Sequence, residues 1–234
     1  MISKSVARII HMMPEKWFVF VAKKVANGYL DKYAKINVEG FENVEKANGP
    51  KIFICNHLSN SDGLILDRIL KEKYDPFFIA GVKLSDDPVT SLGAKLVKSI
   101  NIKPNSADKD AITSIVKSVR EGNNILIFPE GTRSRTGALI EAKKGILLIA
   151  RLTKAQIVPI GMTGTDNLLP INKEGDMSKE EWNYSDVNVK FGEPFTLPLK
   201  EKGEDKHAYD ERVLTFIMKG IANLLPEGYR GFYA

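Results

Sequence analysis

The chain of 234 residues contains one cysteine, Cys55, and this scarcity excludes a disulfide-stabilised scaffold. With a single thiol no internal disulfide can form, so a reducing compartment is the default expectation. Histidine is nearly as scarce, with three residues. No convincing cluster of metal-ligating side chains accompanies these histidines, so the sequence indicates no metal centre.

Long apolar runs are also missing. The densest run, WFVFVA at 17–22, is bracketed by Lys16 and Lys23. It is far shorter than the roughly 18–20 residues that a membrane-spanning helix needs. Charged residues interrupt any signal-peptide core near the N-terminus, and no small-residue cleavage site follows. We therefore expect neither a transmembrane span nor a signal peptide, and a protein on the cytoplasmic side.

The charge imbalance of the chain lies at its N-terminus. Residues 1–35 carry seven basic and two acidic side chains, which accounts for the whole net charge of +5. Apolar residues recur there at helical spacing, and Pro14 suits the first turn of a second helix. Two amphipathic helices over residues 1–33 could anchor the protein at an anionic membrane surface, or they could pack on their own domain. No nucleic-acid-binding motif accompanies the charge, so nucleic acid is not expected as a partner.

Beyond residue 33, short apolar runs alternate with helix-like segments. Strands are predicted over 35–40, 51–57, 76–81, 100–103, 156–164 and 187–195, and residues 123–131 predict a buried strand that runs into a tight turn. Helices are predicted over 63–73, 85–99, 106–122, 137–155 and 205–225. This alternation predicts an α/β fold, a single mixed and largely parallel sheet flanked by helices, over residues 34–234. The polar segment 167–183 predicts a surface loop.

Two polar clusters follow predicted strands, NHLSNSD at 56–62 and PEGTRSR at 129–135. Function collects at the carboxyl ends of strands in such sheets, so we treat the clusters as one site. His57 could act as a general base that Asp62 orients, with a substrate hydroxyl as the nucleophile. Read alone this pair is weak, because the chain has 29 acidic residues, and Asp62 also suits the N-cap of the following helix.

The second cluster has the composition of a phosphate-binding turn. Gly131 lets the backbone approach a ligand closely, and the planar guanidinium groups of Arg133 and Arg135 suit phosphate oxygens. Glu130 could orient an arginine or contact a substrate hydroxyl. The alternative is a solvated loop with incidental charges.

Together with IVPI at 157–160, these clusters resemble the motifs of the glycerolipid acyltransferase family, and within it the 1-acylglycerol-3-phosphate (lysophosphatidate) acyltransferases. The family's first motif, Asn-His-x-x-x-x-Asp, is matched by Asn56, His57 and Asp62. Its third motif, Phe-Pro-Glu-Gly-Thr-Arg-Ser, is matched without exception by residues 128–134. The second motif matches more loosely, with a lysine in place of the expected arginine.

The resemblance implies an enzyme in which His57 takes a proton from the acceptor hydroxyl as that hydroxyl attacks a thioester carbonyl. Asp62 would hold the imidazole in the correct tautomer. The implied substrate-binding residues are Glu130, Gly131, Thr132, Arg133, Lys103 and Lys83. The implied donor is acyl-CoA or acyl carrier protein, the acceptor lysophosphatidate and the product phosphatidate, with no cofactor or metal. The resemblance also favours a peripheral protein whose residues 1–33 lie on the cytoplasmic face of a membrane.

Several alternatives stay open. The acceptor could be glycerol-3-phosphate or another lysophospholipid, the protein could be a non-catalytic membrane-binding module, or His57 could activate water in a hydrolase. Cys55 and His57 point to the same side of a strand and could form a thiol–imidazole pair. A small buried strand residue is the simpler interpretation of Cys55.

Overall fold

The computed structural model describes residues 14–81, 96–103, 108–172, 174 and 179–234. These residues form one seven-stranded sheet in the order β1-β7-β6-β2-β5-β3-β4. The strands are β1 Ala34–Glu39, β2 Lys51–Cys55, β3 Phe77–Gly81, β4 Ser99–Ile102, β5 Ile125–Ile127, β6 Gln156–Thr163 and β7 Ser185–Phe191. The pairing of β6 with β7 is antiparallel and the other pairings are parallel. The predicted single, mixed and largely parallel sheet is confirmed.

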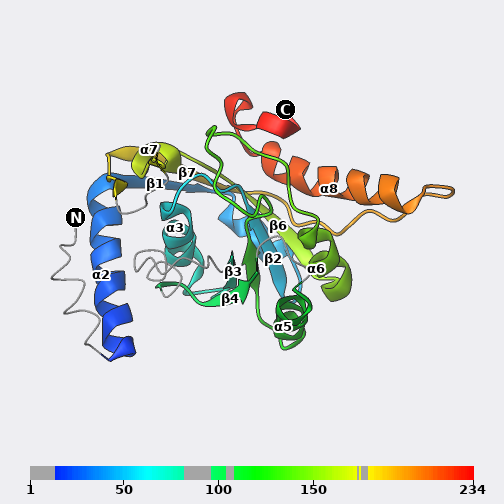
Figure 1. The fold of residues 1–234 in the computed structure, drawn as a ribbon, viewed down its shortest axis with the longest axis horizontal. Coiled ribbons are helices and arrows are strands. Elements are labelled where there is room, and N and C mark those ends of the chain that lie inside the picture. The colour runs from blue at the N-terminus through cyan, green and yellow to red at the C-terminus, as the bar shows by residue number, and fades with distance from the viewer. Residues whose placement is uncertain (1–13, 82–95, 104–107, 173, 175–178) are drawn as a thin grey trace.

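Helices cover both faces of this sheet (Figure 1). They are α2 Glu15–Tyr33, α3 Ser61–Leu70, α5 Lys109–Arg120, α6 Gly145–Thr153, α7 Thr165–Leu168 and α8 Lys206–Ala222. One apolar cluster packs under α5, α6 and α8, and a second under α2, α3 and α7. Strand β2 contributes Ile52 and Ile54 to the first cluster and Phe53 and Cys55 to the second. Because strand side chains alternate in direction, a strand buried on both faces must be apolar throughout, as β2 is.

The N-terminal segment is described only in part. Of its two predicted helices, the first lies outside the described residues and the second is present as α2. Helix α2 packs against α3 through ion pairs of Lys23 with Asp67 at 3.0 Å and of Asp31 with Arg68 at 2.6 Å. No helix among the described residues is both long enough and apolar enough to cross a membrane.

The start of α5 differs from the prediction. The carboxylate of Asp108 caps this helix by accepting a hydrogen bond from the N–H of Ala111 at 3.0 Å. The helix begins at Lys109. Residue 106, where the prediction began, lies outside the described residues, as does almost all of the helix predicted over 85–99.

The predicted helix over 137–155 is too long, because only Gly145–Thr153 is helical. Residues 137–144 pass beside the C-terminal tail instead. The N–H of Leu139 donates to the carbonyl of Tyr229, and the carbonyl of Leu139 accepts from the N–H of Phe232, both at 2.9 Å. These long-range bonds use the backbone groups that a helix would need.

Candidate active site

The two polar clusters meet at the carboxyl ends of β2 and β5, which are neighbours in the sheet. The N–H of Ser134 donates to the carbonyl of His57 at 2.7 Å, and the N–H of His57 donates to Oε1 of Glu130 at 2.7 Å. Backbone and side-chain bonds thus fasten one cluster to the other. The parallel pairing of β2 and β5 accounts for this, because it brings both strand ends to the same edge of the sheet.

His57 and Asp62 lie in direct contact, with Nδ1 of the imidazole 2.7 Å from Oδ2 of the carboxylate. The same oxygen accepts the N–H groups of Leu58 at 2.7 Å and Ser59 at 2.9 Å. Two backbone N–H groups and one imidazole nitrogen therefore contact one oxygen of a fully buried carboxylate. When Nδ1 carries the proton and donates it to Asp62, Nε2 is left as an acceptor.

This arrangement corrects the expectation that Asp62 caps the following helix. Asn60 occupies the N-cap position of α3, and Asp62 lies in the first turn of the helix. Its carboxylate turns back to N–H groups that precede it in the chain, so it closes the loop that carries His57.

The His57 ring is also held by an aromatic neighbour. It stacks on Phe128, with ring centroids 4.1 Å apart and planes inclined by 18°. The His57 side chain is still 22% exposed, so the ring is oriented on one face and accessible to a ligand.

Glu130 joins the two clusters from inside the protein. Its side chain is fully buried, and its oxygens accept the N–H groups of His57 at 2.7 Å and Ile140 at 2.9 Å. Burial raises the pKa of this carboxyl to about 7, against the opposing effect of the two N–H donors. Both oxygens thus accept backbone N–H groups, and Glu130 pairs with no arginine among the described residues. The contact of Glu130 with a substrate hydroxyl stays a prediction.

The carboxylate that pairs with Arg133 is Glu180, at 2.6 Å between Nη1 and Oε1. Oε2 of Glu180 accepts a hydrogen bond from the side-chain amide of Asn60 at 2.7 Å. The side chains of Arg133 and Glu180 are 12% and 2% exposed. The prediction of a surface loop over 167–183 is therefore wrong at Glu180. Sequence offered no signal for it, since the adjacent Glu181 looks the same and is exposed.

The other four predicted substrate-binding residues do not all lie at the turn that carries Arg133. Gly131 and Thr132 are exposed on the turn, and Gly131 adopts the positive φ of 70° that favours glycine. Lys103 is exposed at the end of β4, two strands beyond β5 in the sheet. Lys83 lies outside the described residues.

Asn56 fastens the first cluster to β6. Its side-chain amide donates to the carbonyl of Met162 and accepts the N–H of Met162, both at 2.8 Å. Cys55 beside it is fully buried, and burial, then the charges of Asp62 and Glu130, raises the pKa of its thiol well above the usual value. Because a protonated thiol is a poor nucleophile, the burial of Cys55 argues against a covalent mechanism through this residue.

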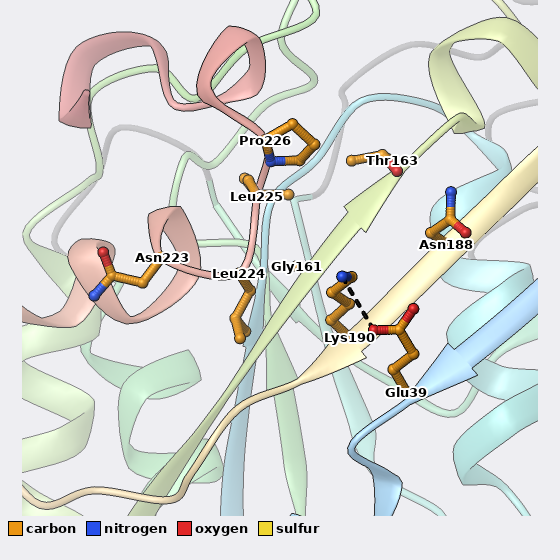
Figure 2. Close-up of a pocket in the computed structure, with 9 residues that line it drawn as sticks. All are labelled: Glu39, Gly161, Thr163, Asn188, Lys190, Asn223, Leu224, Leu225 and Pro226. Carbon is orange, nitrogen blue, oxygen red and sulfur yellow. Dashed lines mark ion pairs between the residues drawn. The ribbon is translucent and has the colours of Figure 1, made fainter.

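A hollow of about 500 Å³ lies elsewhere on the sheet. Figure 2 shows it between the ends of β6, β7 and β1 and the chain that follows α8, beside the ion pair of Lys190 with Glu39. It is lined by Glu39, Gly161, Thr163, Asn188, Lys190, Asn223, Leu224, Leu225 and Pro226. None of these residues belongs to the two polar clusters, so the hollow is not part of the candidate active site.

Known proteins share the fold and the motif-bearing region. A family model described as Acyltransferase matches residues 35–163. The chain is 29% identical over 182 residues to a chloroplast 1-acyl-sn-glycerol-3-phosphate acyltransferase of Arabidopsis thaliana, covering 76% of this chain and 49% of that protein. It is 33% identical over 136 residues to the 1-acyl-sn-glycerol-3-phosphate acyltransferase of Borreliella burgdorferi, covering 57% and 53%.

The chain spans about half the length of these relatives. A crystal structure of the 1-acyl-sn-glycerophosphate (LPA) acyltransferase PlsC from Thermotoga maritima superposes with a TM-score of 0.60 at 23% identity. The match covers 92% of this chain and 85% of the other, which shows a common fold.

Proposed function

Because this chain belongs to the acyltransferase family, as its motifs predicted, we propose that it transfers a fatty acyl group from a thioester donor to the sn-2 hydroxyl of 1-acylglycerol-3-phosphate, forming phosphatidate. The observation that carries this proposal is the contact of 2.7 Å between His57 and Asp62. This pair lies at a strand end that is hydrogen-bonded to the proposed phosphate-binding turn at 129–135. The relatives are named 1-acyl-sn-glycerol-3-phosphate acyltransferases, which supports the choice of acceptor.

In the proposed reaction His57 is the general base. Asp62 holds Nδ1–H, and Nε2 accepts the proton of the acceptor hydroxyl as its oxygen attacks the thioester carbonyl. This attack forms the new C–O bond and gives a tetrahedral intermediate, which collapses as the C–S bond breaks. The proton then passes from Nε2 to the departing sulfur. Asp62 stabilises the imidazolium between these two steps, and the chemistry requires no metal or cofactor.

Arg133 is the proposed ligand of the acceptor phosphate. Its guanidinium uses Nη1 for Glu180, which leaves N–H groups of the fork for phosphate oxygens. The exposed turn at Gly131 and Thr132 would complete this pocket, with Lys103 and Lys83 as further cations. The donor stays a choice between acyl-CoA and acyl carrier protein.

Helix α2 is the proposed contact with the membrane, which would place the protein peripherally on the cytoplasmic face. Trp17 and Phe20 are 65% and 63% exposed, and Lys24 is exposed on the same helix. Exposed aromatic side chains beside lysines suit the interface of an anionic bilayer. The helix still packs on the domain through Leu30, which is buried.

The test is a matrix of purified wild-type and H57A proteins. Acyl-CoA and acyl-carrier donors are combined with lysophosphatidate, glycerol-3-phosphate and other lysophospholipids. We expect turnover with lysophosphatidate in the wild type only, with binding to lipid vesicles retained by H57A. Equal turnover of the two proteins would refute the proposal. Free fatty acid released without an acceptor would indicate a hydrolase.

A further inference from the structure

Glu180 connects the two halves of the candidate site. One oxygen pairs with Arg133 of the proposed phosphate-binding turn (residues 129–135) at 2.6 Å. The other accepts a hydrogen bond from the side-chain amide of Asn60 at 2.7 Å. Asn60 lies in the loop between His57 and Asp62. A single carboxylate thus spans from the proposed phosphate ligand to the loop of the proposed base.

The charge and burial of this pair explain why a carboxylate is needed. Arg133 is 12% exposed and Glu180 is 2% exposed, and a guanidinium so enclosed is costly without a partner of opposite charge. Within the described residues the Arg133 guanidinium has no other hydrogen bond or ion pair. Glu180 therefore sets the direction in which the remaining N–H groups point.

The segment around Glu180 is itself anchored on neighbouring helices. The ring of Trp182 packs on Tyr29 of α2 with centroids 5.5 Å apart, and the N–H of Asn183 donates to the carbonyl of Leu168 at 2.8 Å. Its position is therefore fixed by packing, as a group that orients another side chain requires.

We propose that Glu180 is a positioning residue for the acceptor phosphate. It holds the Arg133 guanidinium in one orientation and ties that orientation, through Asn60, to the loop that carries His57. This inference rests on the proposed function, because it takes Arg133 as the phosphate ligand.

Steady-state kinetics with lysophosphatidate test the role of Glu180. In E180A we expect the acceptor KM to rise about tenfold while kcat changes less than about threefold and the donor KM stays constant. E180Q keeps one acceptor oxygen for Arg133, so its KM should rise less. W182A should raise KM by about two- to threefold, because it loosens the segment. E181A, at an exposed carboxylate one residue away, is the matched control and should behave as wild type.

A thermodynamic cycle with R133A separates positioning from a general loss of structure. In the R133A background, E180A should add less than about a twofold change in acceptor KM. A full tenfold effect in that background would overturn the proposal. So would an unchanged KM in E180A, and so would a lower KM in E180Q, which would mean that Glu180 competes with the phosphate. An active wild type with any of these results refutes this inference alone, whereas an inactive wild type refutes the proposed function and this inference with it.

Discussion

The imidazole of His57 lies against the ring of Phe128, with centroids 4.1 Å apart and planes inclined by 18°. Each residue belongs to a different sequence motif, and each follows the end of a different strand. The contact therefore depends on the pairing of β2 with β5. The Phe128 ring packs on one face of the imidazole and so restricts the orientation of the proposed base.

Replacing Phe128 by leucine should weaken catalysis without unfolding the protein. Leucine fills similar space but cannot stack, so the imidazole gains freedom to rotate. We expect kcat to fall roughly 3–10-fold, in line with about 0.5–1.5 kcal/mol for an aromatic pair. The control is F232L at an exposed ring. Equal kcat values for F128L and wild type would contradict the assigned role.

Asp62→Asn should abolish most of the activity. The amide cannot stabilise the imidazolium and can favour the wrong tautomer, so we expect kcat to fall about 10²–10⁴-fold. Circular dichroism should show that the fold is retained. D67N, which alters a carboxylate paired with Lys23 on the α3 surface, should change kcat little. A D62N loss below about tenfold would argue against a catalytic His57–Asp62 pair.

Glu130→Gln should change the pH dependence of stability. The folded pKa of about 7 lies above the usual 4.5 because of burial, so the folded state holds the proton more tightly than the unfolded state does. The free energy of unfolding should therefore decline as pH rises from about 4.5 to 7 and level off above, by at most about 3 kcal/mol. E130Q lacks this contribution.

Urea unfolding of wild type and E130Q at intervals from pH 4.5 to 8 measures that difference. Other titrating groups are common to both proteins and cancel in the comparison. Stability curves that stay parallel over the whole range would show that Glu130 does not titrate as stated.

Asn56→Ala should destabilise the fold. It leaves the buried N–H and carbonyl of Met162 without their partners, at a cost of about 2–4 kcal/mol in the free energy of unfolding. Urea unfolding measures the loss. N37A removes an amide contact of 3.2 Å to Asn188 at the sheet edge and should cost less than about 1 kcal/mol. Similar losses of unfolding free energy for the two variants would contradict a stabilising role for the hydrogen bonds between Asn56 and Met162.

Trp17 and Phe20 should control binding to membranes. Exchanging both for serine removes the exposed aromatic area of α2, so binding to anionic vesicles should weaken by at least about tenfold. Co-sedimentation with vesicles at low and high salt provides the measurement. L199S, at a leucine that is 88% exposed away from α2, is the control. Undiminished vesicle binding by the double variant would remove α2 from the proposed interface.

Local patterns were enough to predict most elements and the position of the site. Apolar runs such as residues 52–55 require a strand buried on both faces, which implies helices on both sides of the sheet. Polar motifs directly after two such strands point to the carboxyl edge, where the structure joins His57 to Glu130 and Ser134. These features follow from residues close together in sequence.

Other features required the tertiary structure. Strand β1 precedes β2 in the chain yet pairs with β7 at the sheet edge, and residues 137–144 bond the C-terminal tail and form no helix. Glu180 approaches Arg133 only because Trp182 and Asn183 fix its segment on distant helices.

The sequence alone thus determined the class of fold and the pair of motifs, because hydrophobic periodicity and each motif are patterns of residues that lie close together in the chain. Only the tertiary structure decided which of two adjacent glutamates joins the site. Burial of a charged pair depends on packing between segments far apart in the chain, and no local pattern records it.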